Sequence, residues 1–517
     1  MISTERTRKI AGAAAIVMAA YVSSRLTGLL RDVAIGYRFG TGPQLDAYNA
    51  AITVPDLVFQ VVAGAAVASA FIPVYTTYLA RDAQDEGWEM LSIFFTLSVV
   101  VLLPLIVVMM VIAPLVMRVL VPDFKPEYQM LAANLARIVL LAPIFFTLGC
   151  FTTSVLNAHK RFFLAALAPT CYNLGIIVGA VVLSRHFGIY GLALGALLGS
   201  MLFLLVQVPG LRQIRMVFHP GLNLRHEGVR SVGRLMGPRA IGLAVSQINF
   251  LVAVFLASGI SGGISSLKYA WQLTLLPLGI FAMAISTAVF PSLAEQSATK
   301  NHDELRRTML NAMRFILYLT IPASIGLIVL SHPVVHLLYE RGQFTAQSTT
   351  ITADALRLYA LGLFGMATTE IVTRAFYALH DTLTPVKVAA LAMVVNLALA
   401  LILVRTMGEN GLALATATAS TVEASVLFAV AQRRIPGLQI NELASSALKS
   451  LAAAVLMGVT IVAFSTAAAP LERPFGGALL VIGAILIGAA VYVGTTLALR
   501  SDEVGQLRRL FRLAARS

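Results

Sequence analysis

Long apolar segments alternate with short polar loops along this chain, and this alternation predicts its secondary structure. Apolar runs of about twenty residues or more recur throughout, the length an α-helix needs to cross roughly 30 Å of hydrocarbon. A span surrounded by lipid must satisfy its own backbone hydrogen bonds, so each run is expected to be helical. We therefore expect an all-α integral membrane protein of about fourteen transmembrane helices. The expected spans are residues 9–38, 45–79, 90–117, 129–157, 162–184, 188–208, 232–259, 264–294, 307–338, 349–377, 383–405, 409–431, 443–468 and 475–499.

Composition supports this class. Of 517 residues, 58% are hydrophobic and only 12% are charged, about half the charged share of a soluble protein. Cys150 and Cys171 lie inside apolar segments without the spacing of a metal site or redox pair, which favours small apolar filler. The sequence holds no glycine-rich phosphate loop, nucleophile elbow or metal-spaced His/Cys/Asp set. We therefore expect a protein that is not an enzyme and uses no metal or other cofactor.

The net charge of +14 comes from basic residues in short loops between spans. This distribution indicates cytoplasmic loops beside anionic membrane lipids, not a nucleic-acid partner. With the N-terminus inside, inside loops hold roughly three times as many Lys and Arg as outside loops, so both termini are expected in the cytoplasm. The basic start, residues 1–9, resembles a signal peptide, but the apolar stretch continues to Arg25 without a cleavage site. A retained first span is the expectation.

Two sequence matches indicate an internal duplication. Residues 187–194 resemble 407–414, and residues 68–73 resemble 286–291, at nearly the same offset. Six spans per copy give both copies the same topology, a geometry common in transporters. We expect an N-lobe at 1–210 (spans 1–6), a cytoplasmic inter-lobe loop at 211–231 and a C-lobe at 232–435 (spans 7–12). Spans 13–14 follow at 436–500, and the basic tail, 501–517, is expected to form a short amphipathic surface helix.

Seven arginines fall inside the expected spans or at their edges, where each costs roughly 2.5–3.5 kcal/mol at mid-bilayer unless it meets a partner or water. They are Arg25, Arg31, Arg137, Arg239, Arg314, Arg357 and Arg374. Arg239 and Arg314 fit side chains that extend to an interface. Arg25 and Arg31, with Asp32, surround Gly28 in the middle of the first span, a cluster typical of the wall of an aqueous cavity. A structural Arg31–Asp32 contact that locks helices together is the alternative.

Spans two and eight carry helix-breaking residues at corresponding places. Span two contains Pro55, Gly64 and Pro73, and span eight contains Pro277 and Pro291, so both are expected to bend. Bent helices in corresponding places of two repeats indicate moving, substrate-lining elements. Their polar residues, Asp46, Gln60, Lys268 and Gln272, are therefore candidate substrate ligands.

Span ten carries Glu370 and Arg374, one helical turn apart. The two could form a self-neutralising pair, which is the simpler interpretation. Glu370 as the carrier of a coupling ion or proton is the alternative, since ionisable groups inside spans often serve transport.

Several motifs resemble the MurJ/MviN lipid II flippase family of the multidrug/oligosaccharidyl-lipid/polysaccharide exporter superfamily. They are residues 24–32, Phe39-Gly40, Asp46-Ala47, Val54-Pro55, 70–73, 236–238, 245–248 and, most distinctively, 375–387. The resemblance implies two six-span lobes around a cationic cavity and a groove in spans 13–14 for an undecaprenyl tail. It also implies an inner-membrane flippase that carries a lipid-linked glycan precursor, lipid II, outward by alternating access. Cell-wall synthesis proteins are the partners that this family suggests.

The candidate substrate ligands are then Arg25, Arg31, Asp32, Asp46, Gln60, Lys268 and Gln272, because guanidinium groups pair well with phosphate oxygens. The sequence departs from the family at two places. An Arg-Arg pair normally follows Pro-Asn in span two, where this chain has Phe59-Gln60, and Asp-Arg normally stands at Trp271-Gln272. The alternatives are therefore a flippase for another polyprenyl-linked glycan, an ion-coupled exporter of the superfamily, or a non-transporting envelope scaffold.

Overall fold

The computed structural model describes the backbone of residues 2–62, 64–435, 437–438, 440–468 and 476–505. Side chains are described for these residues except 2–19, 21, 61–62, 64–69, 235–246, 248 and 476. The expected amphipathic helix of the tail falls mostly on residues 506–517, outside the described part of the chain.

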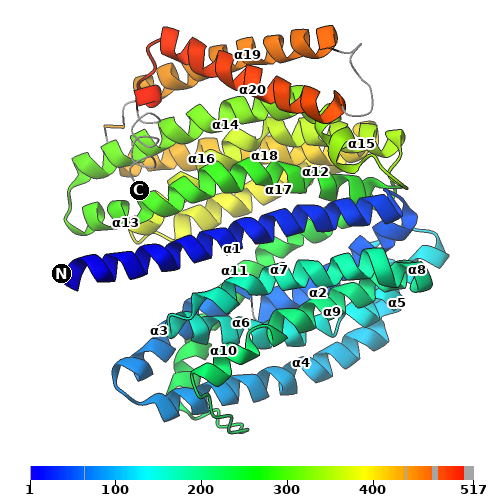
Figure 1. Ribbon diagram of the computed structural model, residues 1–517, viewed down its shortest axis with the longest axis vertical. Coiled ribbons are helices and arrows are strands. Elements are labelled where there is room, and N and C mark those ends of the chain that lie inside the picture. The colour runs from blue at the N-terminus through cyan, green and yellow to red at the C-terminus, as the bar shows by residue number, and fades with distance from the viewer. Residues whose placement is uncertain (1, 63, 436, 439, 469–475, 506–517) are drawn as a thin grey trace. The chain divides into compact units, whose positions relative to one another are not determined.

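Two compact units make up the fold, Met1–Ser265 with Arg341–Phe344, and Ser266–Glu340 with Thr345–Ser517. Within the described ranges the ordered elements are helices and no strand occurs (Figure 1). The first unit contains α1 (Ile2–Phe39), α2 (Pro43–Val62), α3 (Gly64–Ala80), α4 (Gln84–Leu120), α5 (Pro126–Val139), α6 (Ala142–Ala158), α7 (Phe162–Val178), the π-helical turn η1 (Gly179–Leu183), α8 (Ser184–Phe187), α9 (Ile189–Leu205), α10 (Val208–Gln213) and α11 (Glu227–Ala257).

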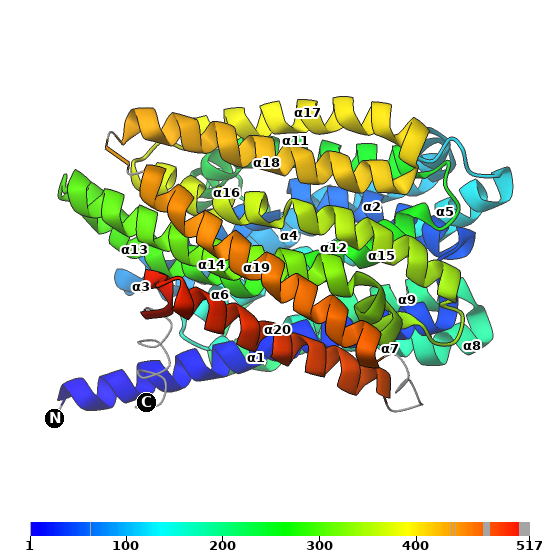
Figure 2. The same ribbon diagram turned by 90° about the horizontal axis from the view of Figure 1, so that it is seen from above.

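The second unit begins three residues into α12 (Gly263–Pro277). It continues with the π-helical turn η2 (Leu278–Met283), α13 (Ala284–Ala298), α14 (His302–Tyr339), α15 (Ala346–Leu361), α16 (Leu363–Ala378), α17 (Leu383–Met407), α18 (Glu409–Arg434), α19 (Ile440–Ala468) and α20 (Gly476–Ala498). Helices α19 and α20 run side by side and pack on α14 (Figure 2).

Every expected span overlaps one of these helices or a broken pair of them. Among described residues, 10 helices are long and apolar enough to cross a membrane, or up to 11 if α15 and α16, bent by 43°, form one span. The three remaining expected spans coincide with α1, with α2 and α3, and with α11, each of which includes side chains outside the described set. The helical membrane class is confirmed, and the count of fourteen stays a prediction.

Of the two spans expected to bend, span eight shows a change of helical type. Span two is described as α2, which contains Pro55 and reaches Val62, and α3, which starts at Gly64 and contains Pro73; residue 63 between them lies outside the described residues. In span eight, α12 ends at Pro277 and continues as the π-helical turn η2 before α13, which contains Pro291. Proline has no N–H to donate and its ring clashes with the preceding turn, so a local change of helical repeat at Pro277 is the physical consequence.

The duplication is visible in the backbone. Residues with positive φ occur at helix corners in five pairs separated by roughly the offset of the sequence matches. The pairs are Gly40 and Gly262, Asp82 and Lys300, Lys160 and His380, Gly188 and Gly408, and Arg215 and Gly437. Gly188 has φ 55° and ψ −135°, and Gly408 has φ 60° and ψ −136°. The two repeats therefore turn the chain with the same local geometry, while the lobe boundaries expected from sequence stay a prediction.

We predict that Gly188→Ala and Gly408→Ala destabilise the protein by similar amounts, about 1–3 kcal/mol each, because a Cβ is strained in this backbone region. Thermal unfolding of the detergent-solubilised protein measures the effect. Gly477→Ala is the matched control, since no atom lies within 4 Å of its Cβ position near the start of α20. Unchanged unfolding temperatures for Gly188→Ala and Gly408→Ala would contradict the positive-φ backbone conformation at these two corners.

Candidate functional site

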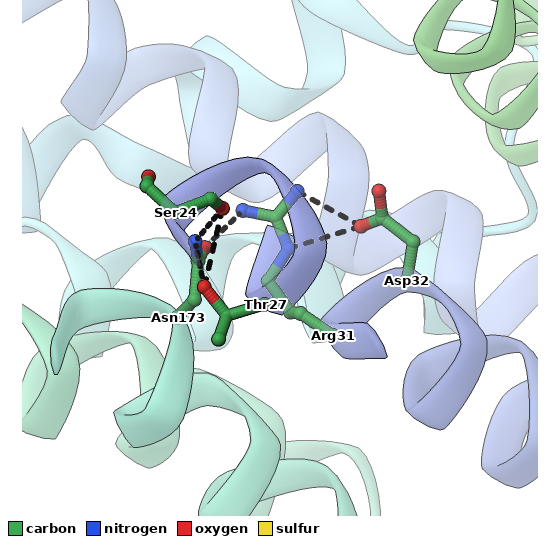
Figure 3. Close-up of polar contacts among 5 residues, drawn as sticks. All are labelled: Ser24, Thr27, Arg31, Asp32 and Asn173. Carbon is green, nitrogen blue, oxygen red and sulfur yellow. Dashed lines mark hydrogen bonds and ion pairs between the residues drawn. The ribbon is translucent and has the colours of Figure 1, made fainter. Parts of the chain in front are cut away.

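Arg31 on α1 is held by a hydrogen-bond network with α7. Its Nε and Nη2 donate to Oδ1 of Asp32 at 3.0 and 2.8 Å, and its Nη1 donates to Oδ1 of Asn173 at 3.1 Å (Figure 3). The amide of Asn173 donates in turn to the carbonyl of Ser24 at 3.1 Å and to the hydroxyl of Thr27 at 3.4 Å. The guanidinium is therefore fixed in orientation by partners from two helices.

This network is largely sheltered. The side chains of Arg31 and Asp32 are 19% and 8% exposed, and Oδ2 of Asp32 is buried with no hydrogen-bond partner among the described atoms. Arg25 lies nearly two turns before Asp32 on α1 and is partly exposed. The Arg31–Asp32 contact expected as the structural alternative is thus present, and it leaves one carboxylate oxygen unused.

Asp46 has a different environment. The side chain is buried and accepts hydrogen bonds from the backbone N–H of Gly262 at 2.6 Å, the N–H of Ser265 at 2.8 Å and the Ser265 hydroxyl at 2.6 Å. Backbone N–H groups at a helix start have no intrahelical acceptor, so this carboxylate stabilises the N-terminus of α12. Its observed contacts are those of a structural residue.

The remaining candidate ligands are more accessible. Gln60 on α2 is partly exposed. In the second unit, Lys268 is exposed and Gln272 is partly buried, one turn later on α12. Amide and ammonium groups at these places can donate hydrogen bonds to phosphate or sugar oxygens.

Glu370 and Arg374, the charged residues expected in span ten, lie on α16 of the second unit. Arg374 lies 5.9 Å from the ring centroid of Phe290, and it also interacts electrostatically with Glu370. Glu370 interacts in turn with Glu423 on α18. Sequence reasoning missed Glu423, although an acid among the small and apolar residues of α18 was a usable signal.

Two further arginines occupy equivalent positions in the repeats. Arg137 donates to the carbonyl of Met110 at 2.9 Å and to Oδ1 of Asn134 at 2.9 Å. Arg357 donates to the hydroxyl of Ser331 at 2.7 Å and to Oδ1 of Asp354 at 3.1 Å. Each arginine therefore bridges two adjacent helices, α4 and α5 or α14 and α15, and this pairing offsets the cost of placing a cation there.

Arg314 is also paired instead of extending to an interface alone. It donates to Glu503 Oε1 at 2.8 Å and to Asp502 Oδ2 at 2.9 Å, and lies 3.7 Å from Glu442. The hydroxyl of Ser446 donates to the same Glu503 oxygen at 2.8 Å. This cluster holds the segment after α20 against α14 and α19.

An apolar cavity of about 680 Å³ lies in the second unit. Helices α14, α15, α16, α18 and α19 line it, and the α19 wall consists of Ile440, Leu443, Ala444, Ala447, Leu448 and Leu451. No residue of α20 described here lines the cavity, so of the two expected groove helices only α19 contributes to this wall. We call it the α19 groove.

The distinctive segment 375–387 forms the corner between α16 and α17. Asp381 accepts hydrogen bonds from the N–H of Thr384 at 3.0 Å and from its hydroxyl at 2.7 Å. The Thr384 hydroxyl and N–H hold the pKa of Asp381 below its ordinary value. The carboxylate therefore stays charged at neutral pH and stabilises the start of α17.

A duplicated helical chain with paired charges inside its spans and an apolar groove defines a polytopic membrane transporter. A family model described as lipid II flippase MurJ matches residues 35–471. The chain belongs to the lipid II flippase MurJ family, and it is a transporter, not an enzyme.

Individual relatives agree with this assignment. A probable lipid II flippase MurJ of Rhizobium tropici is 31% identical over 511 residues, which cover 95% of this chain and 94% of the relative. The lipid II flippase MurJ of Burkholderia cenocepacia is 30% identical and covers 80% of this chain and 81% of its own length.

Solved structures give the same fold. A lipid II flippase MurJ structure in an inward closed conformation has a TM-score of 0.79 and 29% identity, covering 94% of this chain and 99% of that chain. An inward-facing multidrug MATE transporter of the MOP superfamily has a TM-score of 0.67 at 19% identity, over 80% of this chain and 95% of its own. At that identity the second likeness concerns the fold alone.

We predict that Asp46→Asn lowers thermal stability by about 1.5–3 kcal/mol, because hydrogen bonds to a buried charged acceptor are lost or reversed. Ser265→Ala removes one of the donors and should cost less. Thermal unfolding of purified protein provides the measurement. If Asp46→Asn melts like the wild type but abolishes transport, the carboxylate serves the substrate instead of the fold.

Proposed function

We propose that this protein carries lipid II from the cytoplasmic to the periplasmic face of the inner membrane by alternating access, with both termini in the cytoplasm. Family membership supports the cargo, since the relatives named above are lipid II flippases. The observation that carries the chemistry is the oriented, sheltered guanidinium of Arg31.

The Arg31 network suggests how a diphosphate would be bound. In the structure the fork of Arg31 faces one oxygen of Asp32, an anion that a phosphate oxygen resembles in charge and geometry. A diphosphate would replace Asp32 as the acceptor of both hydrogen bonds, while Asn173 keeps the guanidinium aligned. Asp32 would then serve to keep the cation neutralised when no cargo is present.

The residues at the places of the missing family arginines would bind the head group of the cargo more weakly than arginines would. Gln60 and Gln272 offer amide donors without charge, and Lys268 offers an ammonium group one turn from Gln272. We propose that these groups bind the sugar and peptide oxygens of the head group, while Arg25 and Arg31 bind the diphosphate.

The α19 groove fits the lipid part of the cargo. Its walls are almost entirely apolar, and burial of hydrocarbon there is favourable by about 25 cal/mol per Å². We propose that part of the polyprenyl tail occupies it, in keeping with the lipid-tail role expected for residues 436–500. We propose that the helices bend during transport at the positions expected from sequence, Gly28, Pro55, Gly64, Pro73, Pro277 and Pro291.

An ion-coupled mechanism is the second candidate, and Glu370 with Glu423 and Arg374 is the observation that favours it. Glu370 lies near both Arg374 and Glu423, and a pair of carboxyl groups beside a cation can take up and release a proton or small cation. This role adds to the flippase function as a source of driving force.

We predict that Arg31→Ala and Arg25→Ala each reduce outward delivery of lipid II roughly 10- to 100-fold, the loss expected for a charge-assisted hydrogen bond to phosphate. A strain depleted of the native protein is complemented with each variant, and lipid II is measured on both leaflets. Arg405→Ala, an exposed arginine near the end of α17, is the matched control. Normal delivery by both variants, with expression verified, would favour the scaffold alternative.

A second prediction concerns the groove. Ala447→Trp fills the α19 groove and should lower lipid II delivery several-fold without loss of folded protein, because the tail competes for the same apolar space. Leu479→Trp, at a position 70% exposed on α20, is the control. Wild-type delivery by well-folded Ala447→Trp would place the tail elsewhere.

A further inference from the structure

The segment between α10 and α11 exposes apolar side chains outside any site described above. Val217, Phe218, Leu222 and Leu224 are 48%, 51%, 53% and 57% exposed. Exposed apolar clusters of this kind in an ordered loop usually contact a partner or a membrane. We call residues 214–226 the connecting loop.

Backbone and side-chain contacts hold the connecting loop in place. The N–H of His219 donates to the hydroxyl of Ser92, a fully buried residue of α4, at 3.0 Å, and the ring of Phe218 lies 6.4 Å from that of Phe95. At the other end, Nδ1 of His226 accepts from the N–H of Gly228 and caps α11. The apolar side chains therefore point outward from an anchored backbone.

The contact with α4 places the loop near the edge of the apolar layer. Phe95 begins a stripe at every fourth residue that continues through exposed Val99, Leu103, Val107 and Val111, the face that α4 presents to lipid. No charged residue occurs between Glu89 and Arg118. Phe95 lies six residues inside that stretch, about 9 Å along the helix, which is the depth of the boundary between headgroups and acyl chains.

Charge favours the same location. Arg212, Arg215, Arg225 and Arg230 flank the apolar residues and are all exposed, whereas Glu227 is the one acid within this stretch of sequence. Arginines around an apolar patch are the composition of interfacial segments, which bind through inserted side chains and attraction to anionic lipids.

We propose that the connecting loop is a membrane-surface element. Val217, Phe218, Leu222 and Leu224 insert at the headgroup boundary, and the four arginines bind the phosphates of anionic phospholipids. The bilayer surface is the occupant that both the apolar exposure and the positive charge fit. This inference does not depend on the identity of the cargo.

The test uses the full-length protein in lipid nanodiscs. Single cysteines at positions 218, 222 and 224, in a background with Cys150→Ala and Cys171→Ala, carry an environment-sensitive fluorophore. Asp85→Cys is the matched control, because Asp85 is exposed at the start of α4 in the same unit. Quenching by lipid-attached spin labels should be about twofold or more stronger at the loop positions than at the control.

Lipid charge provides the second arm. Exchange of the four arginines for glutamine should reduce quenching in nanodiscs that contain phosphatidylglycerol and change it little in phosphatidylcholine alone. Photoreactive phosphatidylglycerol added to the unmodified protein should label peptides from residues 212–225. This measurement needs no substitution, so it tests the proposal even if a variant folds poorly. Fluorophores that report water at all three positions would overturn the proposal. Fluorophores shielded from both lipid and water quenchers would also overturn it, because another protein surface would then cover the loop. Quenching independent of lipid charge would overturn the role of the arginines.

Discussion

An ionised side chain inside a membrane-spanning helix is stable only when a partner offsets its charge, and this constraint organises the polar contacts of both units. Arg31 meets Asp32 and Asn173, Arg137 meets a carbonyl and an amide, and Arg314 meets acids from the chain's last described residues. Arg31 joins α1 to α7, Arg137 joins α5 to α4, and Arg314 joins α14 to the segment after α20, so these charges cross-link helices. Within the Arg31 network, Oδ2 of Asp32 is buried and has no hydrogen-bond partner among the described atoms.

The repeats preserve backbone geometry more faithfully than side-chain chemistry. Corners such as Gly188 and Gly408 share φ and ψ within a few degrees, and Arg137 and Arg357 make equivalent bridges. By contrast, the first unit carries Arg31 with Asp32 and the second carries Glu370 with Glu423. The two sequence repeats therefore share corner geometry and the Arg137 and Arg357 bridges, but they differ in charge at these other positions.

Sequence reasoning located the helices well, because hydrophobic length is a local property. Proline was a weaker guide, since α4 and α14 each contain two prolines and run without a break. Sequence reasoning also placed Arg31 beside Asp32. What it could not supply were partners from distant segments: Asn173 for Arg31, Gly262 and Ser265 for Asp46, and Glu503 for Arg314. Such pairings arise from helix packing, which periodicity does not encode. Asp46 is an example. Its polarity in a proline-containing span suggested a substrate ligand, whereas its contacts are those of a residue that stabilises a helix N-terminus.

The position of Glu503 has a practical consequence for work on this protein. Its carboxylate is 2% exposed, and with Asp502 it supplies most of the negative charge around Arg314. A reporter fused directly after α20 would delete both acids and leave the sheltered guanidinium with one acidic partner, Glu442 at 3.7 Å. Reporter fusions for mapping topology should therefore retain the chain through Glu503, so that the reporter records the native arrangement.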